Sequence, residues 1–187
     1  LRGWVAELDN DNAQGEYYLT DVVTLAVRDR VAVEAFTVAE PEQVLGVNDR
    51  RQLAELERFY QRRQAERLMR EGATLLDPAR VDVRGVVTTG KDVVIDVNVV
   101  FEGTVRLGDR VRIGPFCVLK DAVIGDDVEI LSHCWIEGAE VGAGAQIGPF
   151  ARLRPGSSLA AGVHIGNFVE TKKTRIGLGS KVNHLTY

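Results

Sequence analysis

The sequence has 187 residues, of which 45% are hydrophobic and 27% charged, with a formal net charge of -4. This length can bury the core of one or two domains, and the acidic balance leaves no basic surplus for a nucleic-acid backbone. No apolar run is long enough to span a bilayer or to form a signal-peptide core, so we expect a cytoplasmic protein without a membrane or nucleic-acid partner.

The first 48 residues mix helix and strand signals. Residues 1–8 and 21–28 have helical patterning, whereas Val31–Val38 alternates as a half-buried strand does. We interpret residues 1–48 as part of an α/β domain, because four elements alone would leave strand edges and half a core exposed. The partner strands are expected either upstream in a longer protein, which we favour, or in another chain.

A long amphipathic helix is predicted over residues 49–72. Its discontinuous apolar stripe consists of Leu53, Leu56, Phe59 or Tyr60, Leu68 and Met69. We expect Asn48 to cap the first turn, Asp49 to favour the positive end of the helix dipole and Gly72 to end the helix. A helix of this length reaches roughly 35 Å, so it would serve as a spacer between domains.

From about Val83 onward the sequence carries a six-residue repeat. The lead residues of the hexads, six apart except for three five-residue steps, are Val83, Thr89, Ile95, Phe101, Leu107, Ile113, Leu119, Ile124, Ile130, Ile136, Val141, Ile147, Leu153, Leu159, Ile165, Thr171, Ile176 and Val182. Glycine often follows the lead residue. A small apolar residue recurs four places after each lead residue. Cys117 and Cys134 occupy this second position, which indicates buried packing residues and no disulfide or metal cluster.

This period predicts a mainly β protein, a parallel β-helix over residues 73–187 with three hexads per coil. Helices need apolar spacings of three and four, and β-sandwiches need longer strands, so both fit worse. Periodicity does not give the hand of the winding. Proteins that resemble this repeat wind left-handed, and the resemblance therefore implies a left-handed β-helix.

Five motifs resemble one bacterial family, the bifunctional N-acetylglucosamine-1-phosphate uridyltransferases/glucosamine-1-phosphate acetyltransferases. They are NAQGEYYLTD (12–21), GVNDRRQLAELE (46–57), IGPFARLRPG (147–156), HIGNFVETKK (164–173) and KVNHLTY (181–187). The resemblance implies that residues 1–48 are the end of the uridyltransferase domain, 49–72 the linker helix and 73–187 the earlier coils of the acetyltransferase domain. Both active sites would then be incomplete in this central fragment.

The resemblance assigns roles in acetyl transfer to four residues. His184 matches the general base, and imidazole titrates in a range suited to taking a proton from a sugar amine. Arg154 and Lys172 match ligands of the sugar phosphate, and the repeat itself places them one coil apart on one face. Tyr187 matches a further substrate contact. Arg152 and Lys173 are more simply explained as solvated corner residues.

The uridyltransferase site is represented by fewer residues. Asn48 corresponds to a ligand of Mg²⁺ and of the nucleotide sugar, although one oxygen ligand cannot hold Mg²⁺ alone and a helix-capping role explains the residue equally well. Tyr18 and Thr20 resemble residues of the sugar pocket. His133 and His164 are interpreted as structural, because their spacing does not match the zinc-binding histidines of γ-type carbonic anhydrases, which also use hexapeptide β-helices.

The resemblance implies an enzyme that acetylates glucosamine 1-phosphate with acetyl-CoA and uridylylates the product with UTP and Mg²⁺. The product, UDP-N-acetylglucosamine, feeds cell-envelope synthesis, and the expected assembly is a homotrimer that binds small sugar phosphates and nucleotides. The alternative for these 187 residues is a non-catalytic trimerising scaffold.

Overall fold

The computed structural model describes residues 1–185, which divide into two compact units, Leu1–Gly46 and a second that begins at Val47. Within the described residues, no helix is both long and apolar enough to cross a membrane.

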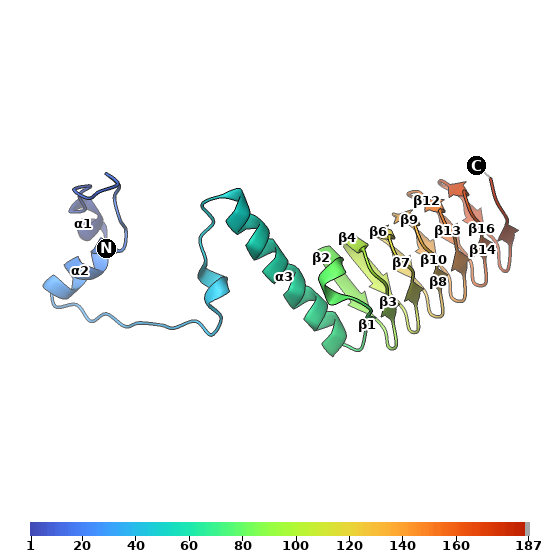
Figure 1. Ribbon diagram of the computed structural model, residues 1–187, viewed down its shortest axis with the longest axis horizontal. Helices are drawn as coiled ribbons and strands as arrows, with labels where there is room; N and C mark the ends of the chain where they lie inside the picture. The colour runs from blue at the N-terminus through green and yellow to red at the C-terminus, as the bar shows by residue number, and fades with distance from the viewer. Residues whose placement is uncertain (186–187) are drawn as a thin grey trace. The chain divides into compact units, whose positions relative to one another are not determined.

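The first unit contains two short helices, α1 (Arg2–Ala6) and α2 (Asp21–Arg28), and a 3-10 turn, η1 (Pro41–Val44) (Figure 1). The indole N–H of Trp4 donates to Asp29 at 2.7 Å, and Arg28 forms an ion pair with Glu7 at 2.8 Å. These contacts join α1 to the end of α2. Both predicted helices are confirmed.

The strand predicted over Val31–Val38 is wrong. This segment has no regular secondary structure, and Val31, Val33 and Phe36 are 48%, 49% and 91% exposed. Apolar alternation does not suffice for a strand, because the backbone must also bond to a neighbouring strand. Among residues 1–185, no strand pairs with this segment.

The second unit begins with α3 (Arg50–Arg70), which confirms the long helix. Asp49, and not Asn48, caps it, because the Asp49 carboxylate accepts the amide N–H of Gln52 at 2.7 Å. The N–H of Asn48 instead donates to the Gln52 side chain at 2.7 Å. At the other end Gly72 has a φ of 106° and donates to the Met69 carbonyl, which ends the helix as predicted.

The predicted stripe of α3 is correct only in part. Leu68 is fully buried, but Leu53 and Tyr60 are 56% and 47% exposed. The buried face consists of Gln61, Ala65 and Leu68, on the last three turns. The helix therefore packs through its C-terminal half.

The remaining elements form a parallel β-helix of stacked coils (Figure 1). Within the described residues, one sheet contains seven strands: β1 (Thr74–Leu75), β3 (Val94–Ile95), β5 (Arg112–Ile113), β8 (Glu129–Ile130), β11 (Gln146–Ile147), β14 (His164–Ile165) and β17 (Lys181–Val182). A 3-10 turn, η2 (Pro78–Arg80), precedes β2.

The β-helix has three faces, and the second sheet covers the two faces that the first sheet does not. It contains β2 (Val81–Thr89) and β4 (Val99–Leu107), which run unbroken past the corner between these faces. One face continues with β6 (Val118–Lys120), β9 (Trp135–Glu137), β12 (Arg152–Leu153) and β15 (Glu170–Thr171), and the other with β7 (Val123–Ile124), β10 (Glu140–Val141), β13 (Ser158–Leu159) and β16 (Arg175–Ile176).

The core confirms the repeat. The lead residues from Ile95 to Ile165 are at most 5% exposed, and the second series of small residues, including both cysteines, is equally buried. Cys117 and Cys134 are unbridged. A hydrogen bond with the Cys134 thiol, together with burial, raises the pKa of Cys117, so this thiol stays protonated and packs as a small apolar group.

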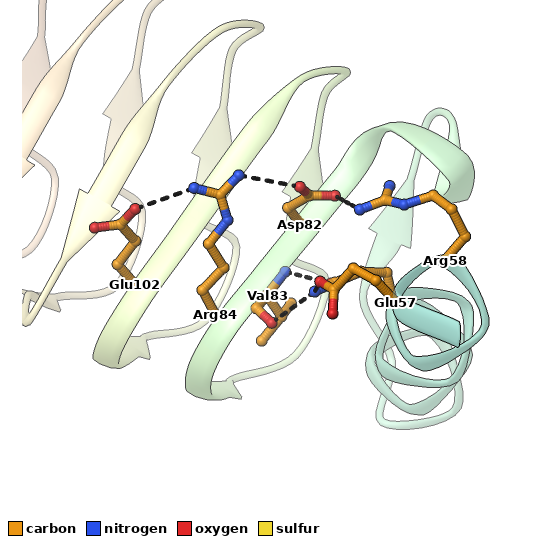
Figure 2. A network of polar contacts seen from close by, with 7 residues as sticks. Glu57, Arg58, Asp82, Val83, Arg84 and Glu102 are labelled. Carbon is orange, nitrogen blue, oxygen red and sulfur yellow. Dashed lines mark hydrogen bonds and ion pairs between the residues drawn. The ribbon is translucent and has the colours of Figure 1, made fainter. Parts of the chain in front are cut away.

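Helix α3 covers the open edge of β2, the first strand of its sheet. Gln61 is 4% exposed, and its side-chain amide replaces the backbone partner that a neighbouring strand would supply. Its N–H donates to the carbonyl of Val83 at 3.0 Å, and its oxygen accepts the Val83 N–H. A row of charges, Arg58–Asp82–Arg84–Glu102, crosses the same junction on the surface (Figure 2). The helix thus satisfies backbone groups that an uncovered edge would leave open.

Candidate functional site

Arg154 and Lys172 lie together on one corner of the β-helix. Arg154 follows β12 and Lys172 follows β15, and these strands pair in register, Leu153 opposite Thr171. The Arg154 N–H also donates to the Thr171 carbonyl at 2.9 Å. The structure therefore confirms that the two cations are one coil apart, and we call residues 154–157 and 172–174 the cation corner.

The guanidinium of Arg154 is oriented by a carboxylate that sequence reasoning missed. Its Nη1 donates to Glu170 Oε1 at 2.7 Å, and Arg152 Nη1 lies 3.9 Å from the other oxygen of Glu170. Arg154 and Glu170 side chains are 36% and 34% exposed, so solvent or a ligand reaches both. The available signal was the register itself, because residues eighteen apart stack and Glu170 follows Arg152 by eighteen.

His184 lies on the preceding corner, after β17. The N–H of Leu185 donates to Asn167 at 3.3 Å, and Gly166 donates to Val182 at 2.7 Å, which stacks residues 183–185 on residues 166–168. A Cβ on Gly166 would collide with the Asn183 carbonyl, so glycine permits this close stacking.

The His184 corner and the cation corner border the same face. Residues 166–168 lead into β15, and the cation corner follows it, so the two corners are separated by roughly 10 Å, the length of about three strand residues. A small molecule lying across Glu170 would therefore have one of these corners on each side. Tyr187 lies outside the described residues.

Asn48 is remote from this site within the second unit, because α3 packs on the first coil, formed by β1, η2 and β2. A single amide oxygen cannot hold Mg²⁺ alone, because protein sites usually bind this ion through one or two carboxylates and substrate phosphates. In the described part of the chain, no group of three or more His, Cys, Asp or Glu residues could hold a metal ion. Residues 1–185 therefore do not form a magnesium site by themselves.

The first unit contributes less to a site. The Tyr18 hydroxyl donates to the Gln14 side chain at 2.7 Å, and Thr20 stands at the N-terminus of α2. These positions show no chemical role by themselves.

His133 has a packing role. Its ring stacks between Phe116 and Phe150, with centroids 5.0 and 4.8 Å away, and Phe168 extends the stack. His164 lies on β14, in register with Gln146 and Lys181, on a different face from Glu170.

Comparisons with known proteins agree with this architecture. The acetyltransferase domain of PglB from Neisseria gonorrhoeae, solved with acetyl coenzyme A, superposes with a TM-score of 0.55 at 16% identity, over 66% of this chain and 63% of that one. The same domain without that ligand gives 0.54. At this identity the likeness establishes the fold alone, a parallel β-helix shared with hexapeptide acetyltransferases.

The family follows from the sequence matches. The family model described as GMPPB C-terminal domain matches residues 83–184, more than half of the chain, and the chain belongs to this family. Over its whole length the chain is 62% identical to the bifunctional protein GlmU of Marinobacter nauticus and 61% identical to that of Methylococcus capsulatus. It spans 41% of the length of each. These matches confirm the resemblance identified from the five motifs.

Proposed function

We propose that this chain is part of a bifunctional enzyme that acetylates glucosamine 1-phosphate with acetyl-CoA and uridylylates the product with UTP. The observation that carries the acetyl-transfer step is the cation corner, with Arg154 and Lys172 one coil apart, bordering the same face as His184. The match along the whole chain to bifunctional GlmU proteins supports both activities.

In the proposed acetyl transfer, Arg154 and Lys172 bind the phosphate of glucosamine 1-phosphate. Glu170 engages one N–H of the Arg154 guanidinium, which leaves its other donors for phosphate oxygens. The sugar ring then lies across the face of β15 with its amine toward His184.

His184 acts as the general base in this proposal. The neutral amine attacks the thioester carbonyl of acetyl-CoA while imidazole takes the amine proton. A C–N bond forms, the C–S bond breaks, and coenzyme A leaves as its thiol once it regains a proton. Tyr187 is proposed as a further substrate contact.

For uridylyl transfer we propose that residues 1–48 are the end of the nucleotidyltransferase domain and 49–72 its linker to the β-helix of residues 73–187. Asn48 would supply one ligand of Mg²⁺ and of the nucleotide sugar. The remaining ligands must come from outside the described residues, so no step of this reaction is assigned to them. We propose that both reactions take place in the cytoplasm.

The proposed assembly is a homotrimer. The outward residues Val100, Val118 and Trp135 stack in register on one face, and Trp135 is 43% exposed, so this face presents an apolar column to a neighbouring subunit. Light scattering should give three times the chain mass of 20.5 kDa. A monomer that persists at high protein concentration would contradict the trimer.

An acetyltransfer assay tests the proposed function. We expect the protein, at the full length of its curated relatives, to acetylate glucosamine 1-phosphate, and His184→Ala to lower kcat by about 10²- to 10⁴-fold. His164→Ala, on a different face, is the matched control and should retain activity. Full turnover by a folded His184→Ala variant would exclude His184 as the base. Robust turnover by the 187-residue chain alone would exclude the scaffold alternative.

A further inference from the structure

The cation corner differs in length from the same corner in neighbouring coils. Between the lead residues Leu153 and Leu159 the chain takes six steps, whereas it takes five from Ile136 to Val141 and from Thr171 to Ile176. The extra residue falls in the turn that follows Arg154. This turn is therefore not a simple repeat of its neighbours.

A buried polar pair lies beneath this turn. Ser157 takes the place that Ala122 and Ala139 take in the preceding coils, and Thr171 follows Leu153 in a column of large apolar lead residues. Ser157 and Thr171 are only 2% and 7% exposed. Hydroxyl groups in such surroundings cost free energy unless they are hydrogen bonded.

The two hydroxyls form a chain that ends on the backbone of Arg154. Thr171 Oγ1 donates to Ser157 Oγ at 2.9 Å, and Ser157 Oγ donates to the Arg154 carbonyl at 2.7 Å. The Ser157 N–H donates to the same carbonyl, and the Arg154 N–H donates to the Thr171 carbonyl. Both backbone polar groups of Arg154 are thereby tied to Ser157 and Thr171.

Thr171 also immediately precedes Lys172, so this hydrogen-bond chain connects the backbones of both cations. Arg154 is held at two points, its peptide by the buried hydroxyls and its guanidinium by Glu170. We propose that Ser157 and Thr171 are positioning residues that fix the spacing of Arg154 and Lys172 for binding a phosphate monoester. This inference rests on the proposed function of the cation corner.

The chain offers a matched control for removal of the Thr171 hydroxyl. Thr89 is also a threonine at a lead position, but its buried Oγ1 has no hydrogen-bond partner among the described residues. Thr171→Val and Thr89→Val are therefore the same near-isosteric change with and without the hydroxyl chain. Thr171→Ser keeps the hydroxyl and serves as the conservative variant.

Two measurements on the full chain test the proposal. Calorimetric titration with glucosamine 1-phosphate should show binding weakened about fivefold to tenfold in Thr171→Val and in Ser157→Ala, as expected for loss of one ordering hydrogen bond. The double variant should be no weaker than either single variant, because both interrupt one chain. Amide hydrogen exchange at Arg154 should be faster in Thr171→Val. Thr89→Val and Thr171→Ser should match the wild type in both measurements.

Unchanged affinity and unchanged exchange in Thr171→Val would overturn the proposal and leave the proposed function intact. Absence of phosphate-dependent binding in the wild type would instead count against the proposed function. In that case exchange decides alone: faster exchange at Arg154 in Thr171→Val but not in Thr89→Val supports the positioning role, and equal exchange overturns it.

Discussion

The two ends of the β-helix use buried polar groups in different ways. At the first coil, Gln61 of α3 bonds to the backbone of Val83 and closes a strand edge, while the Thr89 hydroxyl has no partner among the described residues. At the last described coils, the Thr171 hydroxyl is bonded through Ser157 to Arg154, whose side chain reaches the surface. Polar contacts complete the fold at one end and hold Arg154 of the cation corner, the proposed binding site, at the other.

The largest expected effect on stability is at the end covered by α3. Leu68→Ala removes a fully buried side chain that packs between α3 and the first coil, and should lower the free energy of unfolding by about 3 kcal/mol. Ile176→Ala, at the other end, removes a partly buried side chain and should cost about 1 kcal/mol. Urea titrations followed by circular dichroism measure both. Equal losses would contradict the difference between the two ends.

Removing the hydrogen bonds between Gln61 and Val83 should have the next largest effect on the free energy of unfolding. Gln61→Ala leaves the buried N–H and carbonyl of Val83 without their partner and should cost about 2 kcal/mol. Gln64, three residues further along the same helix, provides the control. Gln64→Ala should change the free energy of unfolding by less than about 0.5 kcal/mol. If the two substitutions cost the same, Gln61 does not protect the edge of β2.

The two lead-position threonines should respond in opposite directions. Thr89→Val removes an unpartnered buried hydroxyl and should stabilise the protein by about 1 kcal/mol. Thr171→Val removes a bonded hydroxyl and should destabilise it by about 0.5 kcal/mol. Thermal unfolding of both variants beside the wild type provides the comparison. Stabilisation by both would show that the hydroxyl chain contributes nothing to the fold.

The surface charges at the α3 junction should matter least. A double-mutant cycle on Arg58 and Asp82, which pair at 2.9 Å with side chains 53% and 22% exposed, should give a coupling of about 0.5 kcal/mol. The value should fall in high salt because solvent ions screen this pair. A coupling above about 2 kcal/mol would mean that the ion pair, and not Gln61, dominates the junction.

The repeat made most of the fold predictable. Lead residues such as Ile136 and Leu153 recur because each must fill the same place in successive coils, and periodicity alone then brings Arg154 and Lys172 together. The apolar alternation of Val31–Val38 did not predict its structure correctly, because a strand also needs a neighbouring strand to bond to, and the local pattern does not show whether one is present. The left-handed winding stays a prediction from the resemblance.

The placement of Arg154 and Lys172 was predictable from the repeat, but the residues that contact Arg154 were not. Glu170, Ser157 and Thr171 act through contacts between coils, and a polar residue at one repeat position does not reveal which neighbour it bonds. Asn48 was misplaced by one residue as a cap because Asn48 and Asp49 are both good capping residues, and only the backbone geometry selects Asp49.

The proposed acetyl transfer depends on the cation corner binding the phosphate of the substrate. The most direct measurement compares kcat/KM for glucosamine 1-phosphate and for unphosphorylated glucosamine in the wild-type, full-length protein and in Arg154→Ala. We expect Arg154→Ala to lower kcat/KM about 100-fold for glucosamine 1-phosphate and to leave it unchanged for glucosamine, because only the phosphorylated substrate loses a charge-assisted contact. An equal loss with both sugars, or no loss with either, would contradict it.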